Sequence, residues 1–92
     1  MTKADLVEKV ANATGFTKSE SALVCQAFLE AIKETLASGH NIEIRGFGTF
    51  KIKKRKARVA RNPRTGEVVP IPDRLVPVFK PSNELKAMVM GE

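Results

Sequence analysis

The sequence predicts an α+β fold, in which two N-terminal helices and a short C-terminal helix form a base and a small antiparallel sheet carries a protruding two-stranded β-arm. Three observations predict this fold. Helix-capping signals precede apolar residues at helical spacing in the first 39 positions. Apolar and polar residues then alternate at the strand period of two. Finally, eight of the 16 lysines and arginines fall in one 14-residue window, 51–64, that contains no acid.

The 92 residues are expected to form a single domain. In this domain 1–39 is a helical dimerisation region, 40–81 is the sheet with the arm at about 53–72, and 82–92 is the C-terminal helix. An exposed arm leaves roughly seventy residues for a core, which is marginal for a monomer. A core shared between two chains is therefore expected.

The first helix is predicted over 3–14. Thr2 and Asp5 have the spacing of a capping box, with the hydroxyl at the N-cap and the carboxylate three residues later. Gly15 suits the position that ends the helix. The apolar stripe between these signals consists of Leu6, Val7, Val10 and Ala11.

The second helix is predicted from Lys18 to Ser38, because Thr17 and Glu20 repeat the capping-box spacing and Gly39 follows. Its apolar residues point in several directions, and a helix that is apolar nearly all round is buried on more than one side. We assign the second buried side to another subunit. The predicted dimer core consists of Leu23, Val24, Phe28, Leu29, Ile32, Phe47, Phe50 and Phe79.

A first strand is predicted from Asn41 to Arg45, followed by a tight turn at 46–48 and a second strand that runs from Thr49 into the arm. Past Lys53 the alternation loses its apolar face, which predicts a ribbon that is polar on both faces. Such a ribbon cannot be buried against a core, so it must project until something anionic covers it. An extended strand from Lys53 to Pro63 would reach roughly 33 Å.

The segment 62–66, Asn-Pro-Arg-Thr-Gly, has the composition of a turn and places Pro63 near the tip of the arm. Residues 67–71 can return as the partner strand. Proline cannot donate to a ladder, so the returning chain is expected in edge-strand or irregular geometry; its prolines are Pro70, Pro72 and Pro77. Val76, Val78 and Phe79 are expected to bring the chain back to the body, and Ser82 can cap the last helix.

The charge distribution points to a polyanionic partner. The net charge of +6 divides into +8 within 51–64 and −2 elsewhere. DNA recognition by a helix-turn-helix motif is disfavoured because the two predicted helices together carry a net charge of −1. The arm interleaves its cations with alanine and valine rather than aromatic residues, so the stacking pattern of single-strand binders is absent.

Several other classes of function are disfavoured. One cysteine and one histidine, Cys25 and His40, do not make a protein-ligated zinc site or an intramolecular disulfide. The basic window lacks an acid, and no phosphate-cradling glycine loop follows a strand. We therefore expect no enzyme activity, metal, cofactor or small-molecule substrate. The N-terminus does not resemble a signal peptide, and no apolar run approaches the ~20 residues of a membrane span.

The sequence resembles the bacterial histone-like HU and integration host factor proteins, and is closest to HU. The resemblance rests on Gly46-Phe47-Gly48-Thr49-Phe50, on Arg61-Asn62-Pro63-Arg64-Thr65-Gly66 and on Val76-Pro77-Val78-Phe79-Lys80-Pro81. It departs at Ser82-Asn83, where the family commonly has glycine and a basic residue, and at Pro70, which is more typical of one integration host factor subunit.

The resemblance implies an intertwined dimer, homomeric or with a paralogous subunit, whose arms enter the minor groove of double-stranded DNA. Pro63 would intercalate, and bent, nicked or flexible DNA would be preferred with little sequence specificity. Compaction of a cytoplasmic nucleoid is the implied role. The predicted DNA-binding residues include the eight cations of the basic window 51–64. The full set is Lys3, Arg45, Lys51, Lys53, Lys54, Arg55, Lys56, Arg58, Arg61, Asn62, Pro63, Arg64, Thr65, Lys80 and Lys86. A sequence-selective bender of the integration host factor type and an RNA-associated structural protein are the alternatives.

Overall fold

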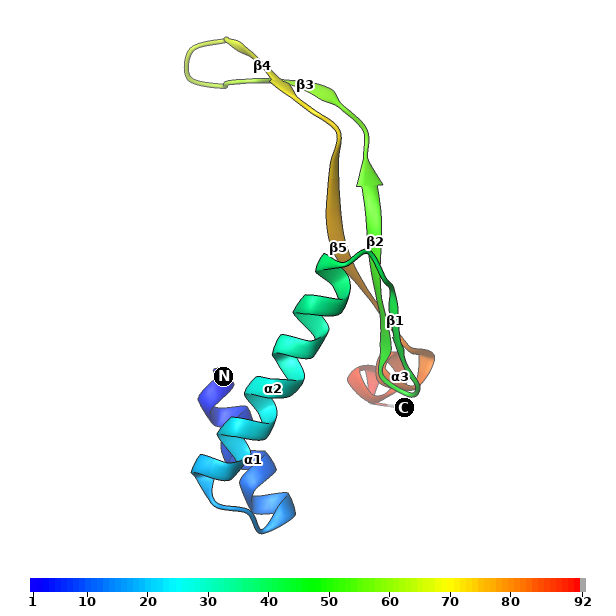
Figure 1. The fold of residues 1–92 in the computed structure, drawn as a ribbon. Helices are drawn as coiled ribbons and strands as arrows, with labels where there is room; N and C mark the ends of the chain where they lie inside the picture. Colours follow the sequence, from blue (N-terminus) through cyan, green and yellow to red (C-terminus); the bar gives the residue numbers. More distant parts are fainter. Residues whose placement is uncertain (92) are drawn as a thin grey trace.

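The computed structural model describes residues 1–91, so Glu92, the last residue of the predicted C-terminal helical region, lies outside the described residues. Two helices are followed by the strands and a final helix (Figure 1). In chain order the elements are α1 (Lys3–Thr14), α2 (Lys18–Ala37), β1 (Ile42–Ile44), β2 (Gly48–Arg55), β3 (Arg58–Arg61), β4 (Val68–Ile71), β5 (Arg74–Pro81) and α3 (Asn83–Met90).

The helix starts follow from their caps. At α1, the Asp5 carboxylate accepts the Thr2 backbone N–H at 2.8 Å. At α2, the Thr17 hydroxyl accepts the Glu20 N–H at 3.1 Å, and the Glu20 carboxylate accepts the Thr17 N–H at 2.9 Å. The hydrogen bond from the Thr17 backbone N–H, with a smaller contribution from the Thr17 hydroxyl, lowers the pKa of the Glu20 carboxyl. The predicted bounds of α1 are confirmed, and α2 ends one residue before the predicted Ser38.

The sheet has the strand order β1-β2-β5, and both pairs are antiparallel. Because side chains alternate across a strand, the register divides the sheet into two faces. The face that carries Ile42, Phe50 and Phe79 is apolar, and α2 lies against β1 and β2. The Phe79 ring centroid lies 4.9 Å from that of Phe50 and 5.2 Å from that of Phe47.

The first strand is shorter than the predicted 41–45, for a local reason at each end. The Asn41 side-chain oxygen accepts the Ile52 N–H at 3.0 Å, so this residue contacts β2 through its side chain. Arg45 begins a turn in which the Phe47 N–H donates to the Ile44 carbonyl at 3.0 Å. The turn therefore covers 45–47 rather than the predicted 46–48, and Gly48 is the first residue of β2, one residue before the predicted start at Thr49.

The arm is two-stranded as predicted, but it is bent, so the extended strand of roughly 33 Å expected from Lys53 to Pro63 is interrupted. Residues 56–57 and 72–73 lie outside the strands, and the distal hairpin β3–β4 forms a separate two-stranded sheet beyond them. Figure 1 shows the change in direction between β2–β5 and β3–β4. Pro72 contributes to the interruption because it has no N–H for a ladder bond.

The last helix begins as predicted at Ser82, whose hydroxyl accepts the Leu85 N–H at 3.1 Å. The Ser82 N–H donates to the Phe47 carbonyl at 2.9 Å, which joins α3 to the β1–β2 turn. Among the helices within 1–91, none has the length and apolarity that a membrane crossing requires.

A single chain does not enclose a hydrophobic core. The radius of gyration is 18.5 Å, whereas a compact chain of this length has about 12 Å. Among residues 1–91 the buried apolar side chains are Val7 and Ala11, which lie between α1 and α2. Leu23 is 73% exposed and Phe28 is 59% exposed. In the single chain, the apolar residues of α2 that are predicted to form a dimer core are therefore left uncovered.

Candidate nucleic-acid interface

The arm carries a dense group of exposed cations with little internal compensation. Lys51 is half-buried, whereas the other seven cations of the basic window are exposed: Lys53, Lys54, Arg55, Lys56, Arg58, Arg61 and Arg64. Within residues 1–91, one ion pair involves the arm, between Lys54 Nζ and Asp73 Oδ2 at 3.6 Å. The remaining charge faces solvent and is available to an anionic partner.

The cations of the arm continue onto one face of the sheet. Lys51, Lys53 and Arg55 alternate along β2, and the register places Arg74 opposite Arg55 and Lys80 opposite Thr49 on the same face. Two guanidinium groups on directly opposed residues repel each other. This cationic face, which consists of Lys51, Lys53, Arg55, Arg74 and Lys80, is therefore organised to bind an anion. It is the opposite side of the sheet from the face that holds Phe50.

Arg74 is the cation that sequence reasoning missed. It shares the period of two with Val76, Val78 and Lys80 along β5, which could have placed it on the cationic face. The sequence analysis predicts for Val76 and Val78 only that they return the chain to the body, whereas the register also places them on the face that carries Arg74. The structure adds Arg74 to the candidate interface.

The tip is a closed turn that leaves Pro63 exposed. The Gly66 N–H donates to the Asn62 carbonyl at 2.8 Å, and the Asn62 N–H donates to the Glu67 carbonyl at 2.8 Å. The Asn62 side chain accepts the Arg64 N–H at 2.9 Å. Gly66 has φ +73°, a left-handed conformation that glycine adopts without steric cost. The turn is thus closed by its own hydrogen bonds, and the rigid pyrrolidine ring of Pro63 is exposed within it.

The prediction that the arm is polar on both faces is wrong. In the distal hairpin Arg58 pairs with Ile71, and Arg61 pairs with Val68 on the opposite face. Val59 is 69% exposed and Val68 is 58% exposed. Val59 comes from the outgoing strand β3 and Val68 from the returning strand β4, so each face of the hairpin combines a guanidinium group with apolar surface.

The structure does not bring the other predicted cations to the arm. Lys3 lies on α1, at the end of the molecule away from the arm (Figure 1), and its Nζ donates to the side-chain oxygen of Gln26. Arg45 lies in the β1–β2 turn and Lys86 lies on α3, next to that turn. All three are exposed. Within one chain they form flanking positions separate from the cationic face.

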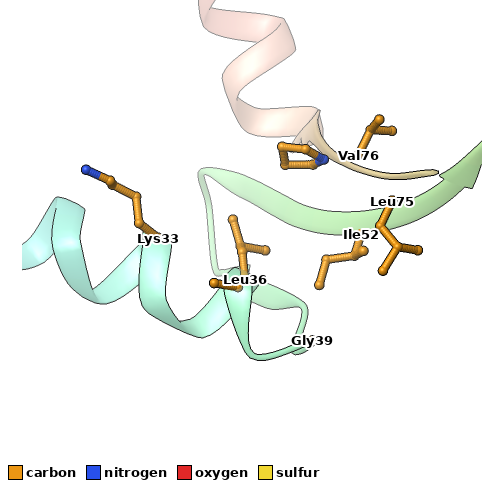
Figure 2. A pocket seen from close by; sticks show the side chains of 8 residues that line it. Lys33, Leu36, Gly39, Ile52, Leu75 and Val76 are labelled. Carbon is orange, nitrogen blue, oxygen red and sulfur yellow. The ribbon is translucent and has the colours of Figure 1, made fainter.

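The hollow in Figure 2 has a volume of about 410 Å³ and lies between the end of α2 and the sheet. Leu36, Ile52 and Leu75 line it with other apolar residues, and Lys33 is the one titratable group. In the part of the chain that the structure describes, no three histidine, cysteine or acidic residues cluster as metal ligands would.

Comparison with known proteins agrees with this geometry. The family model described as "Bacterial DNA-binding protein" matches residues 1–90. Integration host factor subunit alpha of Myxococcus xanthus is 47% identical over 92 residues, which cover 100% of this chain and 71% of the relative. Integration host factor subunit beta of Burkholderia cenocepacia is 44% identical, with 99% of this chain and 86% of the relative covered.

Solved structures of HU proteins have the same fold. The Anabaena HU–DNA cocrystal structure superposes with a TM-score of 0.93 at 38% identity and covers 100% of both chains. HU from Thermotoga maritima gives a TM-score of 0.69 at 31% identity, covering 97% of this chain and 98% of the other. The chain therefore belongs to the family of bacterial DNA-binding proteins that contains HU and integration host factor.

Proposed function

We propose that this protein is a dimeric architectural protein that binds and bends double-stranded DNA with little sequence specificity. The observation that carries the proposal is the projecting arm, whose cations, apart from Lys54, form no ion pair among residues 1–91 and whose tip presents a rigid, exposed proline. A similar chain, HU of Anabaena, is known in a cocrystal with DNA. The proposed contact residues are those predicted from the sequence, with Arg74 added.

Affinity would come mainly from phosphate neutralisation. Each phosphate that a lysine or arginine neutralises releases about 0.9 counterions, so binding weakens steeply as salt rises. The cationic face of β2 and β5 is followed directly along the chain by the distal hairpin, so we expect a single duplex to contact both. Lys3, Arg45 and Lys86 would contact flanking backbone outside this stretch.

The arm would enter the minor groove and deform it. A two-stranded ribbon fits the major groove of about 12 Å, but the minor groove is only about 6 Å wide. Entering it requires widening and bending, which costs on the order of 1–6 kcal/mol, and unstacking at a wedge costs a few kcal/mol more. Pro63 at the tip would be the wedge, and the aliphatic side chains of the hairpin suit the apolar contacts of such binders.

DNA that is already bent, nicked or flexible requires less deformation and would be preferred. Arginine in the minor groove distinguishes little beyond A·T from G·C, so sequence readout would be weak. These properties suit compaction of a cytoplasmic nucleoid rather than recognition of one site, and they require no cofactor or catalytic group.

The functional unit would be a dimer with two arms. The uncovered residues of α2, including Leu23 and Phe28, need a second chain to bury them. The relatives include alpha and beta subunits of integration host factor, so the second chain is either a copy of this one or a paralogous subunit. In this assembly 1–39 would supply the dimer base and 40–81 the sheet and arm.

The proposal is tested by gel-shift titrations of intact, nicked and four-way-junction DNA over a salt series. We expect tighter binding to the nicked and junction forms and a steep loss of affinity with salt. Failure to bind duplex DNA at low ionic strength would overturn the proposal. The same titration with duplex RNA tests the alternative of an RNA-associated protein, which predicts equal or tighter binding to RNA.

Sequence-selective bending of the integration host factor type is the second candidate, because the similar curated relatives carry that name. A selective protein binds its site at least about 10³-fold more tightly than random DNA. Selection from a random-sequence pool separates the two candidates. A single enriched sequence would favour the selective type, whereas broad enrichment of flexible sequences is expected here.

A further inference from the structure

Asp73 lies where the arm bends. The pairing of β2 with β5 ends at Arg55 and Arg74, and the pairing of β3 with β4 begins at Arg58 and Ile71. Residues 56–57 and residues 72–73 are therefore unpaired between the two ladders. Both segments have two residues, so the register is the same on either side of the bend. The bend is an opening of the ladder rather than a bulge.

Proline explains why the ladder opens at this position. Ala57 lies just beyond the end of β2, and its N–H is directed toward the returning strand. The residue opposite Ala57 is Pro72, which cannot donate a ladder bond in return. The Ala57 N–H donates instead to Asp73 Oδ1.

The same carboxylate also contacts β2 below the bend. Asp73 Oδ2 lies 3.6 Å from Lys54 Nζ, so one side chain of the returning strand holds the outgoing strand at two points. Asp73 is the one acid between Glu67 and Glu84, in a region otherwise rich in cations. A negative charge here opposes binding of a polyanion, so its benefit must lie in the geometry that it imposes.

We propose that Asp73 is a positioning residue for DNA bending, whose carboxylate fixes the direction in which the distal hairpin β3–β4 leaves the sheet. The inference rests on the function proposed above. A hairpin held in one direction fits a bent duplex better than a straight one. A hairpin that swings freely adapts to both, and the preference for flexible DNA then falls.

The test compares Asp73→Asn with Asp73→Ala. Both substitutions remove the negative charge and the partner of Lys54, but asparagine keeps a carbonyl oxygen that can accept the Ala57 N–H. Both variants should bind intact DNA more tightly than the wild type, by a similar factor. The ratio of affinities for nicked over intact DNA should stay at the wild-type value in Asp73→Asn and fall about two- to tenfold in Asp73→Ala, as expected for one lost hydrogen bond.

A second measurement uses the free protein and does not depend on DNA. Backbone order parameters over 58–71 should fall from about 0.85 toward 0.6 in Asp73→Ala and remain high in Asp73→Asn. Equal affinity ratios in the two variants overturn the positioning role, whatever the order parameters. If the wild type does not bind duplex DNA, the proposed function and the positioning role both fail, and the order parameters still show whether Asp73 orders the hairpin.

Discussion

Pro63 has a rigid ring, no N–H and an exposed position at the end of a turn whose backbone is bonded internally. These properties suit a wedge between base pairs. Pro63→Ala should remove most of the bending while it changes affinity for linear DNA little, because the lost contact and the avoided unstacking cost oppose each other. The rate of protein-assisted cyclisation of a short duplex should fall about tenfold, given the bending energies involved. An unchanged cyclisation rate would remove the wedge role.

Arg61 and Arg74 lie in different ladders of the arm but share the expected role of phosphate neutralisation. Replacing either one by alanine should weaken binding similarly on many sequences and lower the slope of log affinity against log salt by about 0.9. Lys33, which pairs with Glu30 on α2 at 2.9 Å, offers a control outside the interface. Lys33→Gln should leave the slope unchanged. A loss confined to one DNA sequence would indicate direct base readout instead.

At the scale of the element, Gly48 allows β2 and β5 to approach closely. A Cβ at this position would lie 2.6 Å from the Phe79 ring and 2.6 Å from the Lys80 carbonyl oxygen. Gly48→Ala should lower the free energy of unfolding by about 1–3 kcal/mol, as overpacking does. Thr49→Ala, on the cationic face of the same strand, is the matched control. Urea denaturation at fixed protein concentration measures both, and equal midpoints would contradict this packing.

The helices and turns could be predicted from the sequence because their determinants are local. The hydroxyls of Thr17 and Ser82 accept N–H groups three residues away, as their spacing indicates. The turn at 62–66 likewise closes on itself through Asn62 and Gly66. Local signals of this kind do not depend on the rest of the fold.

The bend of the arm could not be predicted in the same way, because it depends on a contact between segments 16 residues apart, Ala57 and Asp73. Arg74 and the exposed valines of the returning strand were missed for a related reason. Their roles follow from the register that sets them opposite Arg55 and Arg61, and that register appears only when the two strands are paired.

At the scale of the whole molecule, the chain buries too little apolar surface to be stable alone. We expect its thermal midpoint to rise with protein concentration, because dissociation is coupled to unfolding. Sedimentation should give twice the mass of one chain. Phe28→Glu places a charge on the uncovered side of α2 and should prevent dimer formation. A concentration-independent midpoint together with a monomeric mass would contradict the shared core.

Deformation of DNA by the arms is the central feature of the proposed function. Energy transfer between dyes at the two ends of a short duplex measures this deformation directly as the protein is added at low salt. We expect the transfer efficiency to rise in step with binding and to saturate with the ends closer together. Full binding with unchanged transfer would contradict the central claim, because the protein would then coat DNA without bending it.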